Sequence, residues 1–203
     1  MAGYIGSKAV LLSTTAAEVS GDADIGGSLL VDTIKSDNGT TAMTINSSGI
    51  VAKPTIPAFA VHLESSVSVS GSGWADTHGG SWDWNTTHGG YNVGSHYSDS
   101  TNSFTAPVAG LYNFQFSIAM AGSGANTTFR FWIDAADGSD FYRYSGVSFD
   151  SAGETVNDSS ASGTALLAVN DVVKLQVGYA KSNSVEGDSG GFARTWWSGH
   201  FIG

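Results

Sequence analysis

The strongest constraint on the fold of this chain comes from residues 110–118, which follow a proline–glycine corner. Apolar side chains at every second position from 112 to 118 alternate there with Asn, Gln and Ser. This period of two indicates a strand with one buried and one wetter face. Before it, Pro107 fixes one φ angle and Gly110 permits another, so the two predict a corner. We therefore predict that Tyr112, Phe114 and Phe116 lie in a hydrophobic core.

The composition favours a turn-rich β protein. Only 13% of the residues are charged, Gly occurs 27 times and Cys does not occur. Helices stabilised by ion pairs usually carry more charge, so we expect almost no helix. Without Cys, disulfides, thiolate metal sites and thiol nucleophiles are excluded. The same alternation and turn signals predict further strands at residues 59–63, with 67 and 69 continuing the first, and at 129–133, 141–144, 165–169, 173–179 and 196–202.

The charge balance excludes one large class of partners. Lys and Arg together number 8 against 18 Asp and Glu, which gives a formal net charge of -10. Phosphate backbones need a basic patch, so we expect no nucleic-acid partner. The first 20 residues contain no apolar run of the length that a signal peptide or a membrane span needs. We expect synthesis in a cytoplasm and no membrane insertion.

Residues 1–57 differ from the rest of the chain. Their apolar pieces, at residues 27–31, 41–45 and 50–51, are short and are separated by polar turns. Such strands bury little alone but gain a core when three copies wrap about one axis, so we predict a trimerisation or attachment segment. A partly disordered leader is the alternative. Pro54 and Pro57 indicate an extended linker, and we place the domain boundary between residues 57 and 58.

Residues 58–203 resemble the globular C1q domain, the jelly roll that it shares with tumour necrosis factor. The resemblance is carried by Phe104, Pro107, Gly110, Tyr112 and Phe114, preceded by the pattern Asn-x-Gly-x-x-Tyr at 92–97. Residues 163–173 and 198–202 resemble a later strand–turn–strand element and the last strand of the family. The resemblance implies an all-β, antiparallel jelly-roll sandwich that forms a homotrimer. No collagen-like repeat precedes it and the Cys common in the family is absent, so a complement-like role is not supported.

A second resemblance concerns the N-terminal segment. The opening Tyr4, Ile5 and Gly6, together with the phrases at residues 31–34 and 42–45, resembles the N-terminal part of bacteriophage tail-fibre and other virion proteins. It implies that Tyr4, Ile5 and Gly6 attach the chain to other virion proteins. The head would then be displayed on the virion surface after assembly in the host cytoplasm.

The most unusual stretch is the Trp-rich insert at residues 71–91, in which Thr-His-Gly-Gly occurs twice. Exposed Trp rings offer stacking faces for sugars, and neighbouring Asp and His supply oriented hydrogen bonds. Trp is equally favoured at a subunit interface or in a core, so ligand contact and packing both remain open. If the insert binds a host surface glycan, the contact residues are Trp74, Asp76, His78, Trp82, Asp83, Trp84 and His88. Of the adjacent Trp196 and Trp197, one should enter the core and the other should meet a neighbouring subunit.

No catalytic or metal-binding pattern stands out. No Ser lies in a G-x-S-x-G context, so we predict no enzymatic activity. Asp134, Asp137 and Asp140 lack the order of an EF-hand loop and indicate a turn. A metal pair formed by His78 and His88 lacks indicated third and fourth ligands, so we predict neither a metal nor a cofactor.

These observations predict a bacteriophage virion protein, a trimeric short tail fibre whose C1q-like head recognises a host-surface receptor. A capsid decoration protein that braces the head shell is the first alternative. A free C1q-like recognition module outside phages is the second.

Overall fold

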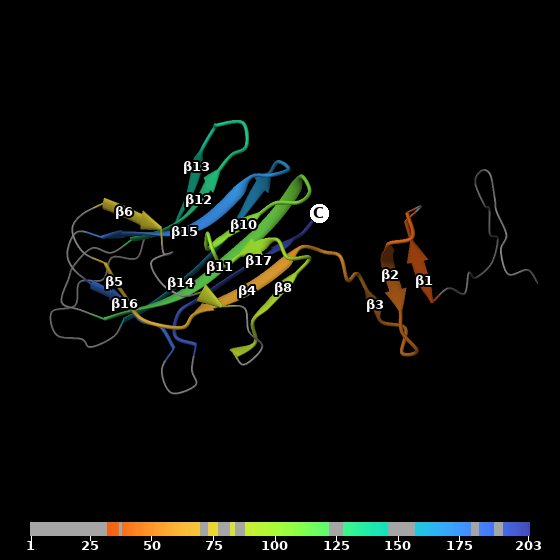
Figure 1. Ribbon diagram of the computed structural model, residues 1–203, viewed down its shortest axis with the longest axis horizontal. Helices are drawn as coiled ribbons and strands as arrows, with labels where there is room; N and C mark the ends of the chain where they lie inside the picture. The colour runs from red at the N-terminus through yellow and green to blue at the C-terminus, as the bar shows by residue number, and fades with distance from the viewer. Residues whose placement is uncertain are drawn as a thin grey trace, which may run out of the picture.

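The chain folds into a β-sandwich and a separate small sheet, drawn at the right of Figure 1. The computed structural model describes residues 32–36, 38–69, 73–76, 82–83, 88–121, 128–145, 157–179, 183–188 and 193–203. Within these ranges no α-helix is present, as the composition predicts. The same ranges contain no helix that is long and apolar enough to span a membrane.

The small sheet is antiparallel and consists of β1 (Thr33–Lys35), β2 (Thr41–Ile45) and β3 (Val51–Ala52). Its turns pass through Gly39 and Gly49, whose φ angles of 83° and 74° favour glycine. Every residue of β1 and β3 is exposed, and β2 is at most half-buried. The strand predicted at residues 41–45 is therefore present, and the one predicted at 50–51 is found at Val51–Ala52; the piece predicted at 27–31 lies outside the described residues. These strands bury no core of their own in a single copy.

One layer of the sandwich is a six-stranded antiparallel sheet. The strand order is β13-β12-β15-β10-β9, and β6 pairs with the C-terminal half of β15. The strands are β6 (Gly73–Asp76), β9 (Tyr97–Ser98), β10 (Ser103–Thr105), β12 (Thr128–Asp134), β13 (Phe141–Ser145) and β15 (Val172–Tyr179).

The other layer is an eight-stranded antiparallel sheet built about the long strand β11. β14 pairs with β11 along one edge and β17 along the other, and β4 continues the sheet beyond β17 (Figure 1). The strands are β4 (Ala58–Leu63), β5 (Val67–Val69), β7 (Trp82–Asp83), β8 (Tyr91–Val93), β11 (Gly110–Ala121), β14 (Asn157–Leu167), β16 (Asn183–Val185) and β17 (Trp196–Phe201).

The core lies between the two sheets and is rich in aromatic rings. Tyr112, Phe114 and Phe116 are each at most 1% exposed, which confirms the phase predicted for β11. Phe59 stacks on Phe104 with ring centroids 5.1 Å apart, and Trp197 meets Phe59 edge to face. Such offset and edge-on pairs add to the free energy of burial itself.

The predicted proline–glycine corner closes against the C-terminal end of the chain. Gly110 has a φ of 152°, and a Cβ there would lie 2.5 Å from the Phe201 ring. Leu111 N–H donates to the Gly203 carbonyl (2.7 Å), and the Tyr112 hydroxyl donates to the Val108 carbonyl (2.8 Å). Only a residue without a side chain fits this approach, so the corner requires glycine.

Asp171 and Asp137 each accept hydrogen bonds that stabilise a turn between strands. The buried Asp171 carboxylate accepts hydrogen bonds from Ala136 N–H and Ala168 N–H, both at 2.8 Å. The Ser139 hydroxyl and the Ser139 N–H (2.9 Å) both donate to the Asp137 carboxylate, and these two hydrogen bonds lower the pKa of its carboxyl. These contacts confirm the predicted turn around Asp137, whereas Asp134 is the last residue of β12.

The strand boundaries differ from the prediction in two places. β14 begins at Asn157 rather than at residue 165, because its polar and small residues pair with β11 although they show no apolar alternation. β5 is separate from β4 and pairs with β16, whereas β4 pairs with β17. Backbone pairing with one neighbouring strand, rather than side-chain pattern, defines these two strands.

Candidate functional site

The predicted contact residues of the Trp-rich insert lie at different places in the sandwich. Trp74 lies on β6 at an edge of the six-stranded sheet, whereas Trp82 and Asp83 lie on β7 of the eight-stranded sheet. His88 precedes β8. The side chains of Asp76, His78 and Trp84 lie outside the described residues, as do those of Tyr4, Ile5 and Gly6.

Trp74 is held on the outer face of its sheet and stays 39% exposed. It pairs with Gly178 of β15, where an added Cβ would lie 2.9 Å from its ring. The Arg130 guanidinium lies 4.0 Å from the ring centroid, and its Nε donates to Gln176 Oε1 (2.7 Å). A cation over the indole and a glycine beneath it fix the ring orientation while one part of the ring remains accessible.

Trp82 packs in the core and is not available for ligand contact. Its side chain is 2% exposed and belongs to the core, because its partner in β4 is the buried Leu63. Its indole therefore offers no free face to a ligand. Trp197 is likewise buried, and Trp196 points out of the opposite face of β17, as the alternation of a strand requires.

A cluster of two histidines and one aspartate lies on the outer face of the eight-stranded sheet. His62 Nε2, His88 Nδ1 and Asp188 Oδ2 form a triangle with sides of 3.3 Å, 3.1 Å and 3.3 Å. The side chain of His62 is 2% exposed, and those of His88 and Asp188 are about 16% and 15% exposed. Three potential ligand atoms thus converge in a nearly buried place.

Backbone contacts hold the aspartate beside the first histidine. Asp188 N–H donates to the carbonyl of Leu63, the neighbour of His62 in β4 (2.8 Å). Leu63 N–H in turn donates to the Thr195 carbonyl (2.9 Å). A Cβ on Gly187 would come within 2.4 Å of the Ser65 backbone, so this approach requires glycine. The position of Asp188 is therefore fixed by the sheet rather than by an exposed loop.

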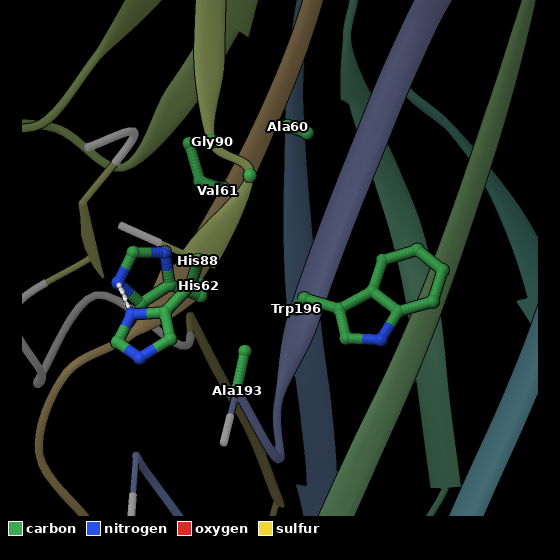
Figure 2. Close-up of a pocket in the computed structure, with 8 residues that line it drawn as sticks. Ala60, Val61, His62, His88, Gly90, Ala193 and Trp196 are labelled. Carbon is green, nitrogen blue, oxygen red and sulfur yellow. Dashed lines mark hydrogen bonds between the residues drawn. The ribbon is translucent and has the colours of Figure 1, made fainter. Parts of the chain in front are cut away.

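A cavity of about 260 Å³ opens beside the cluster. Its lining includes His62 and His88 together with Gly90, Ala193 and Trp196. Figure 2 shows the two imidazole rings close together with a dashed line between their nitrogens; the rings meet edge to face at an interplanar angle of 69°, and Trp196, the cross-strand partner of His62, is drawn to the right of them. Small lining residues leave room for solvent or a small ligand next to the histidines.

Sequence reasoning found one of these three residues. His88 is one of the predicted glycan-contact residues, without a predicted metal, whereas His62 and Asp188 are not among the predicted site residues. His62 could have been noticed because it falls on the opposite phase from Phe59, Val61 and Leu63 in a strand whose other side is core. Asp188 lies among Gly and Ser without periodicity, so nothing in its sequence context indicates a partner 126 residues away in the chain.

The two facing antiparallel sheets and their strand connections define a jelly-roll domain of the type found in C1q and tumour necrosis factor. The model of the C1q domain matches residues 86–202, more than half of the chain, and the protein belongs to the C1q domain family. The Eiger TNF structure from S. frugiperda has a similar fold: it superimposes with a TM-score of 0.54 at 13% identity, over 73% of this chain and 94% of that one.

The globular domain of zebrafish complement 1qA is similar at 15% identity, with a TM-score of 0.47, over 73% of this chain and 98% of that one. No curated protein matches the chain. The family match confirms the C1q resemblance over residues 86–202, and the resemblance of the N-terminal segment to tail fibres stays a prediction.

Proposed function

We propose that this protein is a trimeric short tail fibre of a bacteriophage, in which the C1q-family head recognises a receptor on the host surface. The observation that carries the proposal is the joining of a C1q-family sandwich to a small sheet without a core. Ile50 and Val51 of that sheet are 62% and 50% exposed in one copy. Burial of these side chains between three copies gives the segment a core and a role in assembly.

An apolar patch on the sandwich supports association of copies through the head. Leu111 of β11 and Leu166 of β14 are direct cross-strand partners, and Ile202 N–H donates to the Leu111 carbonyl. Their side chains are 37%, 72% and 53% exposed. Neighbouring apolar side chains on one open sheet face are typical of a subunit interface.

The assembly is tested by native mass spectrometry of the full chain and of Leu166→Glu. We expect a trimer for the parent protein and dissociation for the variant, because the new charge would be buried between copies. Ser100→Glu, in the exposed turn between β9 and β10 of the six-stranded sheet, is the matched control and should stay trimeric. A parent protein that remains a monomer at micromolar concentration would remove both the fibre and the decoration proposals.

Trp74 is the part of the insert that best suits a glycan contact. Its indole is oriented by Arg130 and Gly178 and remains partly exposed. A sugar ring can stack on such an indole, and three copies multiply a weak single site. The formal charge of -10 disfavours long-range attraction to an anionic envelope, so short-range contacts have to supply the affinity.

The receptor role is tested by adsorption to host cells of particles that carry Trp74→Ala. We expect adsorption to fall while trimer mass and melting temperature stay near the parent values, because Trp74 is at a sheet edge. Tyr91→Ala, which removes another exposed aromatic side chain, is the control. Unchanged adsorption with an intact trimer would remove Trp74 from the contact.

Capsid decoration remains the second candidate because the same trimer and apolar patch suit binding between capsomers. Imaging of intact particles separates the two functions. A few trimers at the tail support the fibre, whereas hundreds of trimers over the head support decoration.

A further inference from the structure

We propose that His62, His88 and Asp188 form a binding site for a zinc-class divalent cation, with a fourth coordination position supplied by water from the adjoining cavity. His62 lies on β4, His88 lies shortly before β8, and Asp188 lies in the segment after β16. All three lie within 4.8 Å of one another. The site would join parts of the chain that are far apart in sequence.

The spacing of the three atoms suits tetrahedral coordination. Bonds of about 2.0–2.1 Å from Zn²⁺ to imidazole nitrogen or carboxylate oxygen, at tetrahedral angles, place neighbouring ligand atoms roughly 3.3 Å apart. The observed separations are 3.1 Å and 3.3 Å. The ligand atoms therefore need little movement to accept the cation.

Hydrogen bonds alone do not satisfy the cluster. Among the described residues, His62 Nδ1 and Asp188 Oδ1 have no hydrogen-bond partner and are buried. If Nδ1 of His62 carries the proton, the lone pair of Nε2 faces the Asp188 carboxylate across 3.3 Å, which is repulsive. If Nε2 carries it, Nδ1 is a buried acceptor without a donor. A cation between the three atoms turns the repulsive arrangement into an attractive one.

The ligand set selects the class of metal. Imidazole is a borderline ligand that suits Zn²⁺, and Zn²⁺ also accepts a carboxylate oxygen, whereas Ca²⁺ and Mg²⁺ prefer oxygen ligands alone. Three protein ligands with one open position are typical of zinc sites that bind an exchangeable fourth ligand. The cavity lined by His62, His88 and the small residues Gly90 and Ala193 gives water or a small anion access to that position.

The first experiment measures metal binding by the full chain, purified without a histidine tag and stripped with a chelator. Titration with ZnCl₂ against a chromogenic chelator should give one zinc per chain. Replacement by Co²⁺ should give the intense visible absorption of a four-coordinate ion, and azide should alter that spectrum if the fourth position is exchangeable. Absence of zinc binding would overturn the proposal.

The ligands are tested with His88→Gln and Asp188→Asn, which preserve side-chain size and leave the buried His62 in place. Each should weaken zinc binding by more than the about 10–100-fold that loss of an outer-shell partner costs. His200→Gln, which changes an exposed histidine of β17, is the matched control and should bind like the parent. Zinc should also raise the melting temperature of the parent and the control, but not of the two ligand variants.

Equal affinity in Asp188→Asn and the parent, or loss of zinc in His200→Gln alone, would place the metal elsewhere and overturn the site. Both ligand variants must first show the parent's circular dichroism spectrum. A variant that fails this check is replaced by His88→Ala, whose side chain is partly exposed and whose loss leaves the core untouched. The result is independent of trimer formation and of host adsorption, so it stands apart from the proposed function.

Discussion

The small sheet and the sandwich differ in how much of their apolar surface is buried within one chain. In the sandwich, β11 is 12 residues long and buries every second side chain between two layers. In the small sheet, β1, β2 and β3 have 3, 5 and 2 residues, and none of their side chains is fully buried. Sandwich strands thus obtain their core within one chain, while the strands of the small sheet lack one until another surface covers them.

This difference shows that alternation of apolar and polar residues does not by itself determine stability. Both regions show short-range apolar pattern and glycine turns, yet only the sandwich combines pattern with long pairing, as in the register of β11 with β14 from Gly110 to Met120. Free energy follows the apolar area removed from water, not the pattern. Substitutions of the same kind should therefore have large effects in the sandwich and small ones in the small sheet.

The largest effect is expected for Phe114→Ala. The ring is 1% exposed and lies among Phe59, Phe104, Phe131 and Trp197, so its removal leaves a cavity. We expect a loss of about 3–5 kcal/mol in the free energy of unfolding. Chemical denaturation followed by tryptophan fluorescence measures it. A midpoint close to that of the parent would contradict the phase of β11.

A somewhat smaller effect is expected for Asp171→Ala. Its carboxylate satisfies the N–H groups of Ala136 and Ala168, and the substitution leaves both without this acceptor. We expect a loss of about 2–4 kcal/mol, since each unsatisfied buried donor costs about 1–3 kcal/mol. Asp140→Ala, in the exposed part of the neighbouring turn, is the control and should unfold like the parent.

Much of the sandwich could be predicted from the sequence, because apolar and polar residues alternate along a strand that has one buried face. That is true of Tyr112 to Ile118 and of Trp197 against Trp196. The polar half of β14 could not be predicted, since Ser159 to Thr164 are held there by backbone pairing to β11. Backbone hydrogen bonds are nearly independent of side chain, so they leave little trace in a sequence.

The candidate site was predictable only in part, for a related reason. Trp74 and His88 lie in the Trp-rich insert, whose unusual composition indicates candidate contact residues. Their contacts could not be predicted, because Arg130 and His62 lie on other strands and Asp188 lies in the segment after β16. Convergence of single residues across a sheet depends on register and on close approaches such as that of Gly187 to Ser65, which no local pattern encodes.

An intermediate effect is expected where a side chain is added to the core. A Cβ on Gly199 would lie 2.5 Å from the Phe114 ring and 2.7 Å from Phe59, whereas one on Gly163 would meet nothing within 4 Å. Gly199→Ala should cost about 1–3 kcal/mol through overpacking. Gly163→Ala, in β14, should be neutral or stabilise by about 0.4–1 kcal/mol. Equal melting temperatures for the two variants would show that the core is looser at β17 than the structure indicates.

The smallest effect is expected in the small sheet, where Val51→Ala tests the comparison directly against Val61→Ala. Val51 is 50% exposed and Val61 is 1% exposed, so the same two methyl groups are removed from a wet and a dry environment. Val51→Ala should change sandwich unfolding, followed through the buried Trp197, by no more than about 0.5 kcal/mol. Val61→Ala should cost roughly 1.5–3 kcal/mol, from lost burial and the cavity left behind. A similar loss for both variants would show that the small sheet and the sandwich unfold as one cooperative unit.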